Sequence, residues 1–308
     1  MKFLFLFLDG VGLGPDNPAV NPFVRARMPT MARLLRDKPL VERTAAPGFH
    51  ETERATLVAL DACLGVEGRP QSATGQATLI SGVNVPAIIG RHHGPKPNGE
   101  IVRVLREHNL FGAFSGNGVK MGFLNAFPPR YFDGIQSGLR LPGTVSLAVT
   151  MAGLDLKTVD DLLGGRALSA DFTGRAWREQ LGFPQVDLLS PREAGIRLAT
   201  LAQGYDFSLF EVWLTDYAGH RRNMRDACTL LNTFDRVLNG LLTSWNTGED
   251  LVFITSDHGN MEDLTTRNHT TRPVPALMIG PAGLRRRFFE GMKDLTDVAP
   301  RILTLFNL

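Results

Sequence analysis

The sequence predicts an α/β protein with a doubly wound, mostly parallel sheet and helices on both faces. The prediction depends on apolar runs of strand length, helical patterns between them, and glycine- or proline-rich breaks. The strand-like runs lie at 3–8, 55–60, 119–124, 207–214, 251–255 and 276–279. The helical patterns lie near 29–36, 75–81, 99–108, 192–202, 224–244 and 294–306. This alternation is typical of consecutive βαβ units.

Local sequence signals mark the ends of the first strand and of the elements after residue 190. The run FLFLFL at 3–8 is continuously apolar and ends at Asp9-Gly10, as a strand buried in a parallel sheet does. A helix is expected from Pro191, because the preceding serine is a good N-cap, and Gly204 ends this helix before the strand-like run DFSLFEVWLTD. The apolar run LVFIT follows at 251–255 and leads directly into Ser-Asp-His-Gly.

Periodicity weakens between these stretches, which predicts an insertion. Pro128-Pro129 and two glycine-rich stretches interrupt the pattern there. We therefore expect a metal-binding core formed by residues 1–124 and 191–308, with a small inserted cap at 125–190. The inserted segment contains no histidine and its acidic residues are scattered, so we expect it to select substrate and not to supply metal ligands.

Composition excludes several classes of protein. The 33 basic and 31 acidic residues are well mixed and give a net charge of +2, so nucleic acid is not an expected partner. No apolar run is long enough to span a membrane, and the N-terminal apolar run is too short for a signal peptide. Cys63 and Cys228 are too few for a disulfide framework, so a reducing, cytoplasmic location is expected.

Three aspartates follow predicted strands. Asp9, Asp216 and Asp257 each come at or just after the end of an apolar run. The ends of parallel strands meet at one edge of a sheet, where unpaired carboxylates would repel one another unless cations held them. Each aspartate alone can also be a turn or capping residue.

Three of the seven histidines lie beside these aspartates. His220 is four residues after Asp216, His258 follows Asp257 directly, and His269 comes shortly afterwards. Alone, each can be a surface or loop histidine. Together, carboxylate oxygens and imidazole nitrogens are the ligands that Zn²⁺ and Mn²⁺ prefer, so the combination favours a centre for two divalent metals.

A dinuclear centre also needs a nucleophile, and the segment GRPQSATGQATLISG offers two hydroxyl groups. Ser72 and Thr74 lie just before Gly75, in front of a helical pattern. A helix N-terminus supplies free N–H groups and positive potential, which favour a phosphate or an oxyanion. The alternative is that both are ordinary capping residues.

Five motifs now occur in order along the chain. They are Asp9-Gly10, Ser72-x-x-Gly75, Asp216-x-x-Gly219-His220, Ser256-Asp257-His258-Gly259 and His269-Thr270-x-x-Pro273-Val274-Pro275. This set resembles the metalloenzyme branch of the alkaline phosphatase superfamily, particularly the cofactor-independent phosphoglycerate mutases and phosphopentomutases. The closing LTDVAPRIL also resembles the C-terminal helix of these families.

The resemblance implies a role for each matching position. Asp216, His220 and His269 would hold one metal ion. The other would be held by Asp9, Asp257, His258 and the oxygen of Ser72, with Ser72 as the nucleophile and Thr74 as the alternative nucleophile. The cofactors implied are two divalent ions, Mn²⁺ or Zn²⁺.

The sequence departs from the mutases in two ways. In the mutases the glycine after the nucleophile is followed by histidine, whereas here it is followed by Gln76, and the inserted segment is much shorter than the phosphoglycerate mutase cap. The sulfatase pattern, in which Cys or Ser is followed by x-Pro-x-Arg, is absent here, which disfavours sulfate esters.

The chemistry follows from charge. Two divalent cations, three carboxylates and a serine alkoxide leave a site that is about neutral and can accept a phosphate dianion. We expect a phosphatase or phosphotransferase that acts on a small phosphorylated metabolite through a covalent phosphoserine. The alternatives are an intramolecular phosphomutase of the phosphoglycerate or phosphopentose type and a non-catalytic, metal-stabilised binding protein. A group of four residues follows the helix predicted after the nucleophile: Arg91, His92, His93 and Lys96. These residues are candidates to bind the phosphate or a substrate carboxylate. The alternative is that they are surface residues in contact with solvent only.

Overall fold

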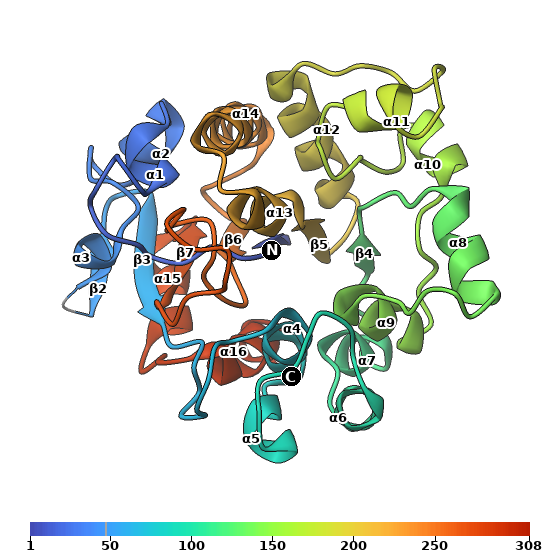
Figure 1. The fold of residues 1–308 in the computed structure, drawn as a ribbon, viewed down its shortest axis with the longest axis horizontal. Coiled ribbons are helices and arrows are strands. Elements are labelled where there is room, and N and C mark those ends of the chain that lie inside the picture. The colour runs from blue at the N-terminus through green and yellow to red at the C-terminus, as the bar shows by residue number, and fades with distance from the viewer. Residues whose placement is uncertain (47) are drawn as a thin grey trace.

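A seven-stranded sheet lies between two layers of helices (Figure 1). The structure is a computed structural model that describes residues 1–46 and 48–308. In the order β2-β3-β7-β6-β1-β5-β4 across the sheet, the strands are Phe49–Glu51, Ala55–Leu60, Val274–Ile279, Leu251–Thr255, Phe3–Leu8, Phe207–Val212 and Met121–Phe123. The predicted α/β class is confirmed.

The helices occupy most of the chain between the strands. Before β4 they are α1 (Pro22–Arg25), α2 (Pro29–Leu34), α3 (Glu42–Ala45), α4 (Ser72–Ser81), α5 (Val85–Ile89), α6 (Gly99–Glu107) and α7 (Leu110–Ser115). Between β4 and β5 they are α8 (Pro129–Gln136), α9 (Thr144–Met151), α10 (Val159–Leu163), α11 (Arg175–Glu179) and α12 (Pro191–Gln203). The remainder are α13 (Leu214–Arg221), α14 (Met224–Ser244), α15 (Ala282–Phe289), the 3₁₀ turn Leu295–Asp297 and α16 (Val298–Leu305).

The sheet is mixed, and its parallel half is continuous. Strands β6, β1, β5 and β4 run parallel, whereas the pairs β6–β7, β7–β3 and β3–β2 are antiparallel. The chain from β6 to β7 contains no helix. Since a parallel connection needs a crossover that is usually helical, β7 returns antiparallel beside β6. The sheet is therefore less parallel than we expected.

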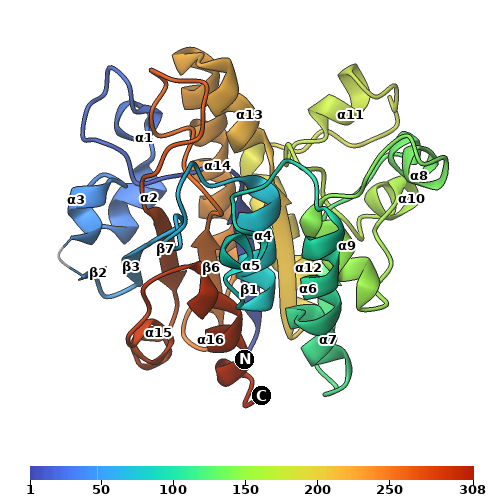
Figure 2. The ribbon, with the colours of Figure 1, turned by 60° about the horizontal axis from the view of Figure 1, so that its bottom comes forward.

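Strand β1 shows why both faces of the sheet are covered. Side chains alternate along a strand, so Phe3, Phe5 and Phe7 face one layer and the three leucines between them face the other. The phenylalanines pack with apolar residues of α4, α6, α7 and α16, and the leucines pack with those of α2, α12 and α14 (Figure 2).

Several predicted boundaries agree with the structure. The strands at 3–8, 55–60 and 251–255 and the helix at 224–244 have the predicted bounds, because their apolar patterns are uninterrupted. The helix expected at 75–81 begins earlier, at Ser72, so the predicted nucleophile occupies its first turn.

The segment 125–190 packs in two ways. Helix α9 contributes Val145, Ala148 and Val149 to the main core beside α4. Further along, Trp177 and Val186 form a small cluster of their own with Ala126 and Ala167. The division into core and cap stays a prediction. Within residues 1–46 and 48–308, no helix has both the length and the hydrophobicity needed to cross a bilayer.

Helices α12 and α14 are in close backbone contact. A Cβ atom at Gly195 would lie 2.0 Å from the carbonyl oxygen of Val237, and one at Gly240 would lie 2.1 Å from the carbonyl oxygen of Arg192. These distances are far below contact, so glycine is required at both positions.

We expect Gly195→Ala to lower the free energy of unfolding by about 1–3 kcal/mol, because the added methyl group forces the two helices apart. Urea denaturation measures this change. Gly283→Ala in α15 is the matched control, because its Cβ would meet nothing within 4 Å. Equal stability of the two variants would contradict the packing described for α12 and α14.

Candidate metal centre

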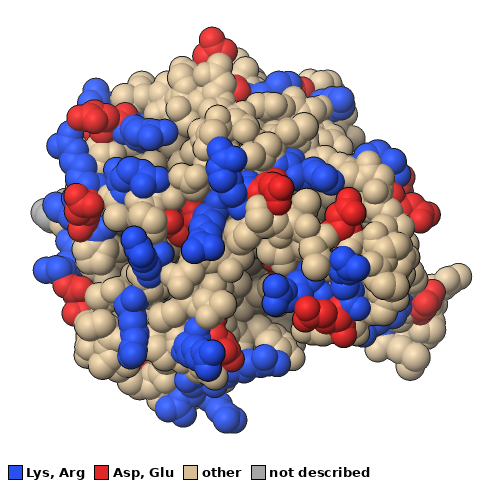
Figure 3. Space-filling view, turned by 90° about the horizontal axis from the view of Figure 1, so that it is seen from above, with Lys and Arg blue, Asp and Glu red and all other residues tan. Residues whose placement is uncertain are grey.

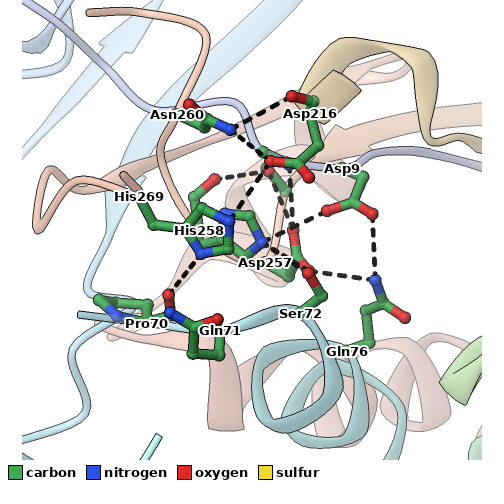
Figure 4. A network of polar contacts seen from close by, with 12 residues as sticks. Asp9, Pro70, Gln71, Ser72, Gln76, Asp216, Asp257, His258, Asn260 and His269 are labelled. Carbon is green, nitrogen blue, oxygen red and sulfur yellow. Dashed lines mark hydrogen bonds and ion pairs between the residues drawn. The ribbon is translucent and has the colours of Figure 1, made fainter. Parts of the chain in front are cut away.

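Three strands bring the predicted carboxylates to one edge of the sheet. Asp9 follows β1, Asp257 lies two residues after β6, and Asp216 lies in the first turn of α13, which follows β5. Because β1 lies between β5 and β6 and runs parallel to both, the three side chains converge (Figure 4).

Glycines allow this convergence. Gly10 has φ of 68°, and a Cβ there would lie 2.5 Å from Asp216 Oδ1. A Cβ at Gly75 in α4 would lie 2.7 Å from the carbonyl oxygen of Asp257. A side chain at either position would therefore push the carboxylates apart.

Four predicted ligands meet at one nitrogen of His258. Its Nε2 atom lies 3.0 Å from Ser72 Oγ, 3.4 Å from Asp9 Oδ1 and 3.5 Å from Asp257 Oδ2. All four side chains are buried. This is the set that the resemblance assigned to one metal ion.

The other predicted set meets at Asp216. His220 Nε2 lies 3.2 Å from Asp216 Oδ2, and His269 Nε2 lies 3.5 Å from Asp216 Oδ1. The two Nε2 atoms are 3.4 Å apart. Asp216 also groups with Asp9 and His258, so it lies between the two sets.

The hydrogen bonds of His220 and His269 leave their Nε2 atoms free to bind a cation beside Asp216. His220 Nδ1 lies 2.6 Å from the carbonyl oxygen of Arg267, and His269 Nδ1 lies 2.8 Å from that of Pro70. A carbonyl oxygen only accepts, so in the neutral rings Nδ1 carries the proton and both Nε2 atoms present lone pairs to each other and to Asp216. Metal-binding histidines have this arrangement. Asp9 Oδ1 is buried without a hydrogen-bond donor among the described residues, and a cation would satisfy it.

The electrostatics fit a cation as well. Burial, followed by the charges of Asp257 and Asp216, raises the pKa of Asp9 well above its usual range. Burial and the charge of Asp216 raise the pKa of Asp257 to about 7. Burial and the neighbouring His269 lower the pKa of His258 to about 3, which leaves its imidazole neutral, as a metal ligand must be. The ring of His258 stacks on that of His269 with centroids 3.7 Å apart.

Comparison with other sequences gives a family match for the C-terminal part of the chain. Residues 193–308 match the model of the Metalloenzyme superfamily. The 2,3-bisphosphoglycerate-independent phosphoglycerate mutases of Cereibacter sphaeroides and Rippkaea orientalis are 28% and 34% identical over 130 and 105 residues. These matches cover 40% and 30% of this chain, but only 25% and 20% of the two mutases.

Solved structures extend the likeness to the whole fold. The alkaline phosphatase of the Antarctic bacterium TAB5 aligns over 99% of this chain and 97% of its own, with a TM-score of 0.56 and 12% identity. The phosphoglycerate mutase of Leishmania mexicana aligns over 99% of this chain and 95% of its own, with a TM-score of 0.51 and 12% identity. Residues 193–308 therefore resemble the Metalloenzyme superfamily, and the chain as a whole shares the fold of these phosphatase and mutase structures.

Gln76, the residue at which the sequence departs from the mutase pattern, contacts two of the carboxylates. Gln76 Nε2 lies 3.4 Å from Asp9 Oδ2 and 3.2 Å from Asp257 Oδ2, so the amide donates to both carboxylates. In the sequence, Gln76 stands where the mutases have histidine, and we predicted no function for it. In the structure Gln76 is buried in α4, and its amide group holds two of the carboxylates in place.

A buried acid that we did not predict supports the loops of the centre. Glu262 is fully buried, and its Oε2 accepts hydrogen bonds from the backbone N–H groups of Gly12 at 2.9 Å and Asn260 at 2.7 Å. Its Oε1 accepts from the hydroxyl of Thr270, the residue after His269. Glu262 therefore ties the loop after β1 to the loop that carries the last predicted ligand. Its position close after the Asp-His-Gly-Asn motif was the sequence signal by which Glu262 could have been predicted.

Two further polar groups lie near the carboxylates. Asn260 Nδ2 donates to Asp216 Oδ1 at 2.6 Å and orients that ligand. Glu211 is the one charged residue of strand β5, which is otherwise apolar except for Ser208, and the sequence interpretation missed this signal. Burial, followed by the charge of Asp257, raises the pKa of Glu211 to about 7, and Lys96 opposes the rise.

The residues predicted to bind substrate do not all approach the centre. His92 Nε2 lies 3.2 Å from the carbonyl oxygen of Val66, and Arg91 is exposed. The backbone of His93 exchanges hydrogen bonds with Thr74, whose amide donates to the His93 carbonyl oxygen at 3.0 Å. Lys96 is half-buried, and Glu211 and Asp9 both act on its charge, so it is the one of the four with an electrostatic link to the carboxylates.

We expect the chain to hold two divalent ions after dialysis against Mn²⁺ or Zn²⁺, because the structure offers two ligand sets joined at Asp216. His220→Ala and Asp257→Ala should each lower the metal content measured by mass spectrometry. His108→Ala is the matched control, because His108 is exposed at the end of α6 and lies in neither set. Unchanged metal content in both ligand variants would contradict the assignment.

Proposed function

We propose that this chain transfers the phosphoryl group of a small phosphomonoester to Ser72 and then to water. The observation that carries the proposal is the position of the Ser72 hydroxyl, which lies in the first turn of α4 and 3.0 Å from His258 Nε2. It is therefore part of the carboxylate and imidazole centre. The match of residues 193–308 to the Metalloenzyme superfamily and the likeness to phosphoglycerate mutases support phosphoryl chemistry at such a centre.

The metal ions would be held by the two ligand sets, one by Asp216, His220 and His269 and the other by Asp9, Ser72, Asp257 and His258. When bound, divalent ions lower the pKa of a serine hydroxyl and balance the charge that develops on phosphoryl oxygens. All other steps fall to groups of the chain itself.

The start of α4 favours a phosphate beside Ser72. The backbone N–H groups of Ser72 and Ala73 have no acceptor among the described residues, whereas those of Thr74 and Gly75 donate to the carbonyl oxygens of His93 and Gln71. Free N–H groups at a helix start bind anions. Lys96 supplies a half-buried positive charge that interacts with the charges of Glu211 and Asp9.

The proposed reaction has two displacements. Ser72 gives its hydroxyl proton to solvent and its Oγ attacks phosphorus. The bond from phosphorus to the ester oxygen breaks, and the departing alkoxide takes a proton from solvent. Water then attacks the phosphoserine, which releases inorganic phosphate and restores the Ser72 hydroxyl with a proton from that water.

An intramolecular phosphomutase is the second candidate. It is favoured by the two phosphoglycerate mutases, which match 40% and 30% of this chain. Transfer within one substrate requires that water is excluded, and the segment 125–190 is short for that task. We propose that this segment selects the substrate in either case.

Product analysis distinguishes the candidates. The Mn²⁺- or Zn²⁺-loaded protein is incubated with phosphosugars, phosphoglycerates and p-nitrophenyl phosphate, and isomers and inorganic phosphate are both measured. A hydrolase releases phosphate in step with substrate loss, whereas a mutase forms an isomer and little phosphate. A fully loaded protein that changes no substrate would instead support the non-catalytic binding protein.

We expect Ser72→Ala to lower turnover by several orders of magnitude, because no covalent intermediate can form. Thr74→Ala is the matched control in the same helical turn. The Thr74 hydroxyl contacts the carbonyl oxygens of Gln71 and His93, so its loss should cost about 1 kcal/mol of stability and little activity. Mass spectrometry of the trapped phosphopeptide gives the position of the label. A label on Thr74 would reverse the assignment of the nucleophile.

A further inference from the structure

A cavity of about 310 Å³ lies where α2, α12 and α14 meet. Each of these helices contributes one arginine to its lining, namely Arg33, Arg192 and Arg236. None of the cavity's lining residues belongs to the metal centre described above. The three arginines are far apart in the sequence, so only the fold brings them together.

The positive charges in this cavity are not balanced by the chain. Asp235 is the one acidic residue of the lining, and it is 1% exposed. Its carboxylate accepts the backbone N–H groups of Thr30 at 3.0 Å and Met31 at 2.8 Å, so it is already used at the start of α2. Among residues 1–46 and 48–308, none of the three arginines has an acidic partner within ion-pair distance.

The positive surface continues beyond the cavity. A smaller cavity of about 100 Å³ shares Thr30, Arg33 and Asn239 with the first and adds Arg54. Figure 3 shows the molecule from the top of Figure 1, where α2 and α14 lie, and lysine and arginine side chains gather over the left and centre of this face.

The three helices are fixed to one another next to the cavity. Asp235 of α14 holds the start of α2 through two hydrogen bonds. Gly240 of α14 lies against the backbone of Arg192 at the start of α12, where no side chain would fit. The arginines therefore project from elements whose relative positions are set by packing.

Guanidinium groups that gather without acidic partners repel one another, and a bound anion removes this cost. Arginine is the residue best suited to phosphate, because its planar fork can donate two hydrogen bonds to one phosphate group. A cavity of this volume is within the range of small-molecule sites. We propose that it binds a small phosphate-bearing anion, such as a diphosphate or a sugar phosphate, at a site separate from the metal centre.

Chemical footprinting of arginine tests the proposal on the metal-loaded, full-length protein. Phenylglyoxal modifies exposed arginines, and peptide mass spectrometry reports the rate at each residue. With inorganic pyrophosphate as the probe, we expect about tenfold slower modification of Arg33, Arg192 and Arg236. Arg103 of α6 and Arg178 of α11 are exposed and outside the cavity, so their rates should not change.

Because each rate belongs to one residue, pyrophosphate bound at the metal centre does not affect the result. Failure of the proposed catalytic function would therefore leave this test intact. Absence of protection, or equal protection of Arg103 and Arg178, would overturn the proposal. Protection by an oligonucleotide but not by pyrophosphate would also overturn it, in favour of a nucleic acid surface.

Charge reversal gives a second test. Arg236→Glu should abolish the protection of Arg33 and Arg192 by pyrophosphate, whereas Arg236→Lys should retain part of it. Arg178→Glu is the matched control and should leave the protection unchanged. Both arginines are exposed on helices, so circular dichroism should show native folding for each variant. Full protection in folded Arg236→Glu would contradict the proposed site.

Discussion

The site depends on one constraint, the convergence of three carboxylates and three imidazoles at one edge of the sheet. The charge of Asp216 raises the pKa of both Asp9 and Asp257, and the charge of Asp257 raises that of Asp9. His220 and His269 present lone pairs to each other at 3.4 Å. Neither arrangement is favourable without a positive charge between the groups. The fold holds them together nonetheless, which is the behaviour of a site organised for cations before the cations bind.

The backbone around the centre is adapted to this convergence. Parallel strands β5, β1 and β6 deliver the three carboxylates, and Gly10 and Gly75 remove the side chains that would separate them. Asn260, Gln76 and Glu262 then fix the ligands and their loops through hydrogen bonds. Ser72 enters the same centre at the start of α4, so the group proposed as nucleophile and the ligand sets are positioned by one arrangement of strands and helix.

Much of the fold could be predicted because its central strands are uninterrupted apolar runs, as at 3–8 and 251–255. The short edge strand β2 was missed, since Phe49–Glu51 is polar and half-exposed and has no pattern of its own. The seven positions predicted as ligands lie in the motifs that carry the family resemblance, and the structure brings their side chains together at one sheet edge. Glu211 and Glu262 were not identified, because a single acid in a strand or loop carries only a weak signal and the tertiary structure is needed to show that it is buried. The arginine cavity unites three distant segments, which no local pattern indicates.

Anomalous X-ray diffraction at the absorption edge of the bound metal tests the central claim most directly. Crystals of the protein grown with Zn²⁺ or Mn²⁺ should give two anomalous peaks. One should lie between His220, His269 and Asp216, and the other beside His258 Nε2, Asp9, Asp257 and the oxygen of Ser72. A fully loaded crystal with no peak at this sheet edge, or with peaks only elsewhere on the surface, would contradict the claim that these buried charges are organised around cations.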